Sequence, residues 1–213
     1  MDTYVDGYCE RVAPGIWGEP LNSLSNLAFL VAAILVWRYA RGDRMGRLLA
    51  VLVGLVFLAS TTFHLLATRW SAAGDSLFIL VFVLCYAVLF PQVFFGVNRR
   101  LAWLGPPAFL ALTAVTALLG GGLYLSALIG LGVFAALLGF SRDAGRRAFW
   151  PRYAVVGAIF ALSLSLRTID PEVCAFLPSG THFLWHLLNG LVLYLVSAAM
   201  IAKRREGSLT ESR

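Results

Sequence analysis

Long apolar runs separated by short polar connections dominate the chain. Each of the seven runs is close to the roughly 20 residues that a helix needs to cross a hydrocarbon core about 30 Å thick. The runs are apolar at odd and even positions alike, whereas the strands of a membrane barrel alternate. The pattern predicts an all-α integral membrane protein, a seven-transmembrane-helix bundle with helices at about 23–40, 47–66, 75–97, 101–119, 122–140, 152–168 and 180–202.

The composition agrees with this prediction. Hydrophobic residues make up 60% of the chain and charged residues only 13%, whereas about a quarter of the residues in a soluble domain are charged. No internal repeat, low-complexity tract or long linker divides the sequence, so we expect a single domain over residues 1–213. We expect an outer N-terminal segment at 1–22 and a cytoplasmic tail at 203–213.

The basic residues predict the orientation in the membrane. Only Arg11, Arg69 and Arg167 lie in connections on the side of the N-terminus, which leaves 14 of the 17 lysines and arginines on the other side. Because basic residues favour the cytoplasmic side, we expect the N-terminus outside and the C-terminus in the cytoplasm. The net charge of +6 is then a topology signal, and we expect no nucleic-acid partner.

Five polar or ionisable side chains stand out within the apolar runs. They are Ser60 and His64 near the end of the second run, Asp75 at the start of the third, and His182 and His186 at the start of the seventh. Such groups are costly to place in a membrane, so each is a functional candidate. The second helix ends on the outer side and the third and seventh begin there, so we expect all five in the outer half of the bundle.

The spacing of these residues favours a metal site. Ser60 and His64 are four residues apart, as are His182 and His186, and this separation places side chains on one face of a helix. Three imidazoles with one open position are typical of catalytic zinc. Zinc lowers the pKa of its water to about 7, and Asp75 is suited to orient that water or to carry its proton.

Structural roles for the same residues remain open at this point. The histidines could be hydrogen-bonded packing residues rather than ligands. Asp75 could cap the N-terminus of its helix, and the Ser60 hydroxyl could bond back to its own helix.

The three cysteines leave two possibilities open. Cys9 and Cys174 are both expected on the outer side, while Cys85 falls inside the third helix. An oxidising compartment would allow the outer pair to form a disulfide, but two free thiols fit the spacing equally well.

Six short motifs occur in an order and spacing that resembles the alkaline ceramidases and their bacterial relatives. The resemblance covers about residues 6–202, and more distantly the chain is similar to the wider seven-helix group that includes the adiponectin receptors. The motifs are Y-C-E at 8–10, E-P-L-N-S-L-S-N at 19–26, S-T-T-F-H at 60–64, Asp75, I-D-P-E-V-C at 169–174 and H-F-L-W-H at 182–186.

The resemblance implies a zinc-dependent intramembrane amidase that splits ceramide into a sphingoid base and a fatty acid. It implies that His64, His182 and His186 hold the zinc. Asp75 would accept and return the proton of the activated water, and Ser60 would stabilise the oxyanion that develops on the amide carbonyl. The family resemblance also implies a disulfide between the N-terminal Cys9 and Cys174.

The resemblance raises the question of a second metal. Eukaryotic members bind calcium through an acidic N-terminal segment, and Asp6, Glu10 and Glu19 are the corresponding candidates here, since calcium takes several oxygen ligands. This chain departs from that pattern, because Gly7 follows Asp6 and Arg11 stands where a further acid is expected. A solvated outer segment, with Asn22 capping the first helix, is the alternative.

Several functions remain compatible with the sequence. A zinc hydrolase of a different membrane lipid, a non-catalytic seven-helix receptor with structural zinc, and a transporter whose polar cluster forms an ion path are the alternatives to the amidase. The ratio of 16 arginines to one lysine suggests a GC-rich bacterial genome and hence a bacterial inner membrane. Because many bacteria make little ceramide, the native substrate stays open.

Overall fold

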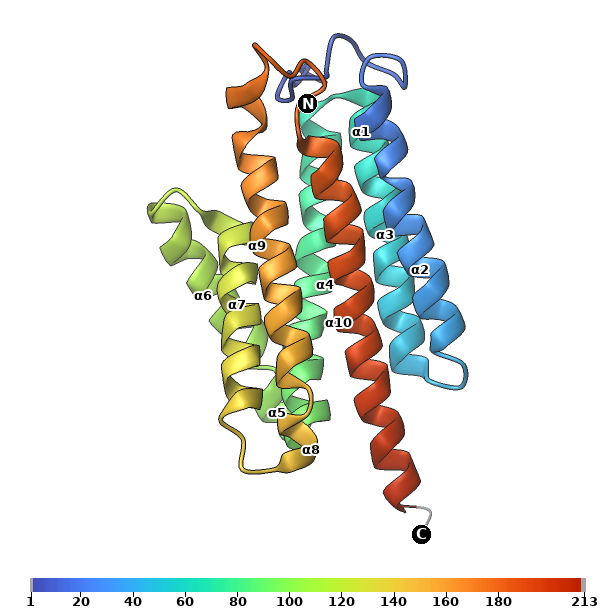
Figure 1. Cartoon of the computed structure of the whole chain (residues 1–213), viewed down its shortest axis with the longest axis vertical. Coiled ribbons are helices and arrows are strands. Elements are labelled where there is room, and N and C mark those ends of the chain that lie inside the picture. Colours follow the sequence, from blue (N-terminus) through green and yellow to red (C-terminus); the bar gives the residue numbers. More distant parts are fainter. Residues whose placement is uncertain (1, 212–213) are drawn as a thin grey trace. The chain divides into compact units, whose positions relative to one another are not determined.

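A computed structural model describes residues 2–211 of the chain, and these residues are almost entirely helical (Figure 1). They contain no strand, only an isolated β-bridge between Tyr4 and Thr68. The helices are α1 (Pro20–Ser25), α2 (Leu27–Tyr39), α3 (Arg44–Leu66), α4 (Arg69–Phe95), α5 (Arg99–Ala102), α6 (Gly105–Leu118), α7 (Gly122–Gly139), α8 (Ala144–Arg147), α9 (Trp150–Val173) and α10 (His182–Glu211).

Seven helical segments in the described residues are long and apolar enough to cross a membrane. Three of the shorter helices join a neighbour to make one such segment: α1 with α2, α5 with α6, and α8 with α9. The predicted number and approximate positions of the helices are therefore confirmed, and they indicate a multi-pass membrane protein. Insertion into a bilayer and the orientation of the two ends stay predictions.

Several helices are longer than the apolar runs. α4 begins at Arg69 rather than near residue 75, because Thr68 and Ser71 cap its first turn: the Thr68 N–H donates to the Ser71 hydroxyl at 3.2 Å. Asp75 therefore lies inside α4, and the idea that it caps this helix is wrong. The predicted tail from residue 203 continues α10 as far as Glu211, and its last two residues lie outside the described range.

The described residues form two compact units. The first contains the chain up to Ile79 together with Ile159–Tyr194, and the second contains Leu80–Ala158 together with the residues from Leu195 onward. The prediction of a single domain stays a prediction.

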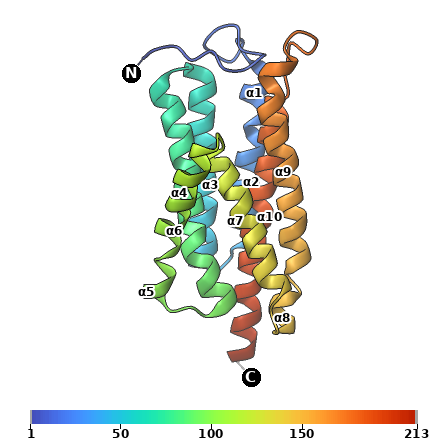
Figure 2. The same ribbon diagram turned by 90° about the vertical axis from the view of Figure 1, so that its left-hand side faces the viewer.

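In the first unit, α2 and α3 pack side by side (Figure 1) around the fully buried Val36, Leu49 and Val53. The N-terminal segment runs across the end of this unit where α3 finishes (Figure 2). Backbone hydrogen bonds hold it there, from the Val5 N–H to the Ala67 carbonyl at 2.8 Å and from the Gly15 N–H to the Leu65 carbonyl at 2.7 Å.

The second unit is built on aromatic packing. Phe90 stacks on Phe134 with ring centroids 3.8 Å apart. The Tyr86 hydroxyl is hydrogen-bonded to the Tyr153 hydroxyl and donates to the Val196 carbonyl at 3.1 Å. These bonds satisfy the polar ends of two tyrosines that are otherwise in an apolar environment.

Candidate metal centre

His64, His182 and His186 come together in the first unit, as the sequence predicts. All three are buried, and each offers a ring nitrogen that lies within 4.8 Å of the other two. Among the described residues, this is the group of histidines, cysteines and carboxylates with the geometry to hold a metal ion. The triad can therefore hold a metal, and the identity of that metal belongs to the proposal below.

Helix ends position the three histidines. His64 lies in the last turn of α3, which stops at Ala67 in a left-handed conformation with φ of 51°. His182 is the first residue of α10, and His186 follows one turn later on the same face. The end of one helix thus meets the beginning of another, and the three imidazoles face each other there.

Two charged groups approach Nδ1 of His64. The Glu19 Oε2 atom lies 3.1 Å from it, and the Glu19 side chain is also bound by Arg11 and by the Asn22 amide. The Arg11 NH2 group lies 3.5 Å from the same nitrogen. A carboxylate accepts a proton from Nδ1–H, whereas a guanidinium only donates, so the two contacts favour opposite tautomers of His64.

Ser25 fixes the tautomer of His186. Its hydroxyl lies 2.7 Å from His186 Nδ1 and donates its single proton to the Asn22 carbonyl at 3.0 Å. The Ser25 oxygen must therefore accept a hydrogen bond from His186 Nδ1–H. Nε2 of His186 is left without a proton.

The Nε2 atoms of His64 and His186 lie 3.1 Å apart. A proton on His64 Nε2 makes this contact a hydrogen bond, and without that proton two lone pairs face each other. Two nitrogens of a tetrahedral zinc site, each at about 2.0–2.1 Å from the metal, would be about 3.3 Å apart. The arrangement therefore fits zinc, and metal-ligating histidines typically bind an oxygen acceptor through the second ring nitrogen in this way.

The ring of His182 stacks on an aromatic side chain. The Tyr8 ring lies parallel to it, with centroids 3.7 Å apart and 21° between the planes. The Nδ1 atom of His182 is buried and has no hydrogen-bond partner in the described part of the chain. An unsatisfied buried nitrogen costs about 1–3 kcal/mol, so this atom also fits a site built for a ligand.

Arg11 and Glu19 form a buried ion pair beside the triad. The Nε atom of Arg11 donates to Glu19 Oε1 at 2.6 Å, and both side chains are fully buried. Burial raises the pKa of the Glu19 carboxyl group, while the charge of Arg11 and the hydrogen bonds from Arg11 and Asn22 lower it. Arg11 is also enclosed by the rings of Phe63 and Tyr8.

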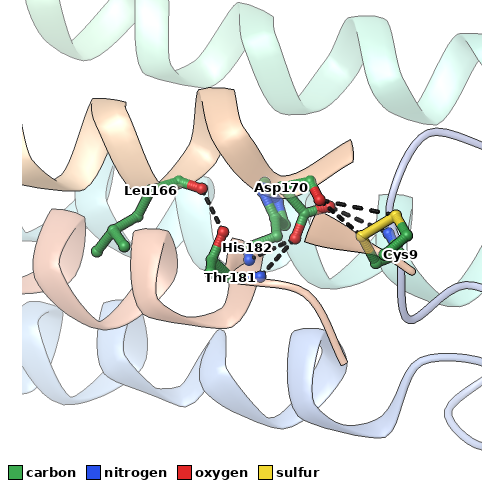
Figure 3. Close-up of a disulfide and its surroundings, with 6 residues drawn as sticks. Cys9, Leu166, Asp170, Thr181 and His182 are labelled. Atoms are coloured by element: carbon green, nitrogen blue, oxygen red, sulfur yellow. Dashed lines mark hydrogen bonds between the residues drawn. A yellow bond between two sulfur atoms is a disulfide. The ribbon is translucent and has the colours of Figure 1, made fainter. Parts of the chain in front are cut away.

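Asp170 of α9 connects the N-terminal segment to the start of α10 (Figure 3). Its Oδ1 atom accepts from the backbone N–H groups of Thr181 and His182, at 2.6 and 2.9 Å, and its Oδ2 atom accepts from the Cys9 N–H at 3.1 Å. A carboxylate at a helix N-terminus satisfies N–H groups that have no partner within the helix. Asp170 thereby fixes the turn that carries His182.

The disulfide implied by the resemblance is present. Cys9 is bonded to Cys174, just beyond the end of α9, while Cys85 is a free cysteine. Together with Asp170, this bond anchors the segment that carries Tyr8 and Arg11.

Ser60 and Asp75 are brought together from α3 and α4. The Ser60 hydroxyl is hydrogen-bonded to the Asp75 carboxyl group, and Asp75 Oδ1 is buried without a hydrogen-bond partner among the described residues. Ser60 is also one turn before the ligand His64 on the same helix. The pair therefore provides a carboxylate with a free oxygen next to the helix face that carries a metal ligand.

The structure does not assemble Asp6, Glu10 and Glu19 into a set of calcium ligands. Asp6 is exposed, Glu10 accepts from the Leu21 and Asn22 N–H groups at 2.8 Å, and Glu19 is paired with Arg11. The alternative cap was also wrong, because Asn22 lies within α1 and the carboxylate of Glu10 binds the first N–H groups instead. Calcium binding stays a prediction without support from this geometry.

Sequence reasoning missed the supports of the ligands, namely Arg11, Ser25 and Asp170. One signal was available: Glu19, Asn22 and Ser25 recur at intervals of three, a polar stripe at the beginning of an apolar helix. Such a stripe indicates a helix face that packs on a polar site. No comparable pattern marks Arg11 or Asp170, whose partners are distant in the sequence.

Comparison with known proteins adds no assignment: no protein-family model matches the chain, and no curated protein is significantly similar to it.

Proposed function

We propose that this chain is a zinc-dependent amidase of the membrane that hydrolyses ceramide, or a related N-acyl lipid, to a sphingoid base and a fatty acid. The observation that carries the proposal is the convergence of three buried imidazoles, each with a ring nitrogen within 4.8 Å of the other two, beside a carboxylate held on the neighbouring helix.

The donor set favours zinc over harder cations. All three donors are imidazole nitrogens of His64, His182 and His186, which suit zinc, whereas calcium and magnesium prefer oxygen ligands. Three protein ligands leave the fourth position of a tetrahedral site open, as in catalytic rather than structural zinc sites. Zinc, when bound there, supplies Lewis acidity that polarises a carbonyl and acidifies water.

Asp75 is proposed to move the proton. The hydrolysis forms a bond between the water oxygen and the acyl carbon and breaks the bond between that carbon and the amide nitrogen. The free Oδ1 of Asp75 can accept the proton that water loses and return it to the departing amine, so that atoms and charge balance.

Ser60 has two possible partners and one proton. In the structure its hydroxyl is bonded to Asp75, which holds the carboxylate in place. When substrate is bound, the hydroxyl can donate to the developing oxyanion only by giving up that bond. We propose that Ser60 positions Asp75 before the reaction and stabilises the oxyanion during it.

The surroundings favour a lipid substrate. The ligands lie within helical segments long and apolar enough to cross a membrane, and Phe29 and Phe63 line the histidines at centroid distances of 5.8 and 5.4 Å. A substrate with long acyl chains can reach such a site from the bilayer. We propose an outward-facing site in a bacterial inner membrane, with the N-terminus outside.

The test is the release of products from a defined ceramide, measured by mass spectrometry on protein purified in detergent. Wild type should release sphingoid base and fatty acid in equal amounts, and His186→Ala should release neither. A Cys85→Ser variant is the matched control, because Cys85 is a free cysteine that belongs to the second unit, whereas the triad belongs to the first. If folded, zinc-loaded wild type cleaves no ceramide but cleaves another lipid, the substrate assignment is wrong. If it cleaves no lipid in a panel of amides and esters, the receptor with structural zinc becomes the better account.

A further inference from the structure

Arg11 is a buried cation that contacts the supports of two metal ligands. Only 4% of its surface is exposed. Its Nε atom donates to the carboxylate of Glu19 at 2.6 Å, and its NH1 atom donates to the Val5 carbonyl at 2.7 Å. The remaining NH2 group also faces Glu19, so each of the three nitrogen groups of the Arg11 guanidinium lies next to an oxygen acceptor.

One contact leads to His64. The Oε1 atom of Glu19 faces Arg11, and its Oε2 atom lies 3.1 Å from His64 Nδ1. A planar guanidinium fixes a carboxylate more strictly than a lysine ammonium, because its donors have a rigid geometry. Arg11 therefore determines how the Glu19 carboxylate presents its second oxygen to the ligand.

The other contact leads to His182. The guanidinium carbon of Arg11 lies 5.2 Å from the centre of the Tyr8 ring, and Tyr8 stacks on His182 at 3.7 Å. On its other side, Arg11 lies 4.7 Å from the ring of Phe63, the residue before His64. The same side chain thus contacts α3 through Phe63 and reaches His182 of α10 only through Tyr8.

We infer that Arg11 is a positioning residue of the metal centre, which holds Glu19 against His64 and Tyr8 against His182. The inference rests on the proposed zinc centre. Arg11 also lies 3.5 Å from Nδ1 of His64, on the far side of the ring from Nε2, and it is not a reactant, so its effect is on the geometry and affinity of the metal site. Because Arg11 and Tyr8 belong to the N-terminal segment, the geometry of the metal centre depends on the position of that segment.

The test is the zinc affinity of detergent-purified protein, first stripped of metal and then titrated in competition with a chromophoric chelator. Wild type should bind one zinc per chain, and Arg11→Ala should bind it about 10–100-fold more weakly, the loss typical of outer-shell substitutions. The zinc affinity of Arg11→Lys should lie between those of wild type and Arg11→Ala, because lysine keeps the positive charge but lacks the rigid planar donors of the guanidinium. Arg69→Ala, which removes an exposed arginine at the same end of this unit, should match wild type.

A second measurement separates positioning from general stability. The visible absorption of the cobalt-substituted protein reports ligand geometry, and it should change in Arg11→Ala while helix content and the disulfide stay intact. A folded Arg11→Ala variant with the zinc affinity and cobalt spectrum of wild type would overturn the inference. If the alanine variant does not fold, Arg11→Lys decides: weakened affinity supports the inference and wild-type affinity overturns it. Wild type that binds no zinc would overturn the proposed centre itself, and the inference with it.

Discussion

The Nε2 atom of His64 lies 3.1 Å from the Nε2 atom of His186, although 122 positions separate the two residues in the sequence. The Nδ1 atom of each histidine lies next to a side-chain oxygen, that of Glu19 for His64 and that of Ser25 for His186. The Nε2 atoms of both imidazoles therefore face one another, which is the expected arrangement for two ligands of a common metal.

Removing the acceptor of His186 should weaken metal binding. In Ser25→Ala, Nδ1 of His186 loses its acceptor, and the ring is no longer fixed in orientation or tautomer. We expect zinc affinity to fall about 10-fold or more, as for other outer-shell partners. Competition with a chelator measures this effect. Ser165→Ala is the control, since that exposed hydroxyl bonds only to the Ala161 carbonyl, and equal affinities for the two variants would contradict the role of Ser25.

Asp75 should be needed for catalysis but not for the metal. Asp75→Asn keeps the shape of the side chain and removes its ability to accept a proton, so we expect the turnover of ceramide to fall about 10²–10⁴-fold. Zinc content should stay that of wild type. Asp43→Asn is the matched control, because asparagine caps a helix as well as aspartate does at the start of α3. Loss of zinc together with activity would show that Asp75 is structural instead.

Asp170 should contribute strongly to stability. Its carboxylate accepts from three backbone N–H groups, on Cys9, Thr181 and His182, and Asp170→Ala leaves these donors without their acceptor. Each unsatisfied donor costs about 1–3 kcal/mol, so a clear fall in the thermal midpoint is expected. Glu172→Ala, an exposed carboxylate two residues later, should leave the midpoint unchanged. Equal midpoints for the two variants would rule out this anchoring role.

The disulfide should stabilise both the fold and the metal centre. It joins Cys9 to Cys174, 165 residues apart, and disulfides that close long loops contribute about 2–4 kcal/mol. The double variant Cys9→Ser/Cys174→Ser should unfold at lower temperature and lose zinc faster to a chelator, because the segment with Tyr8 and Arg11 is released. Cys85→Ser is the control for removal of a thiol. A double variant that loses zinc at the wild-type rate would show that the segment stays in place without the bond.

The apolar pattern predicted which segments form helices but not the residues at which the helices begin and end. Seven runs predict seven spanning segments, because membrane length constrains them directly. The start of α4 was missed, since its first turn is defined by the hydroxyls of Thr68 and Ser71 rather than by apolar residues. Asp75 was therefore expected at a helix end, whereas it lies inside a helix.

The grouping of the three histidines could be predicted and most of their supports could not. His182 and His186 are four apart on one helix, so their convergence follows from helix geometry. Ser25 is 161 positions from His186, and Cys9 is 161 positions from Asp170. Contacts at such separations depend on how the segments fold together, and no local periodicity encodes them. Arg11 entered the sequence analysis in the charge count and as a departure from the acidic pattern, and its role as the partner of Glu19 needed the three-dimensional arrangement.

The most direct test of the central claim is the metal content of the purified protein, measured by elemental mass spectrometry for wild type and for His64→Ala, His182→Ala and His186→Ala. We expect wild type to hold one zinc per chain and each variant to hold little or none, while helix content is retained. Folded wild type that takes up no metal even when zinc is supplied, or single variants that keep a full equivalent, would contradict the assignment of the three histidines as a metal centre.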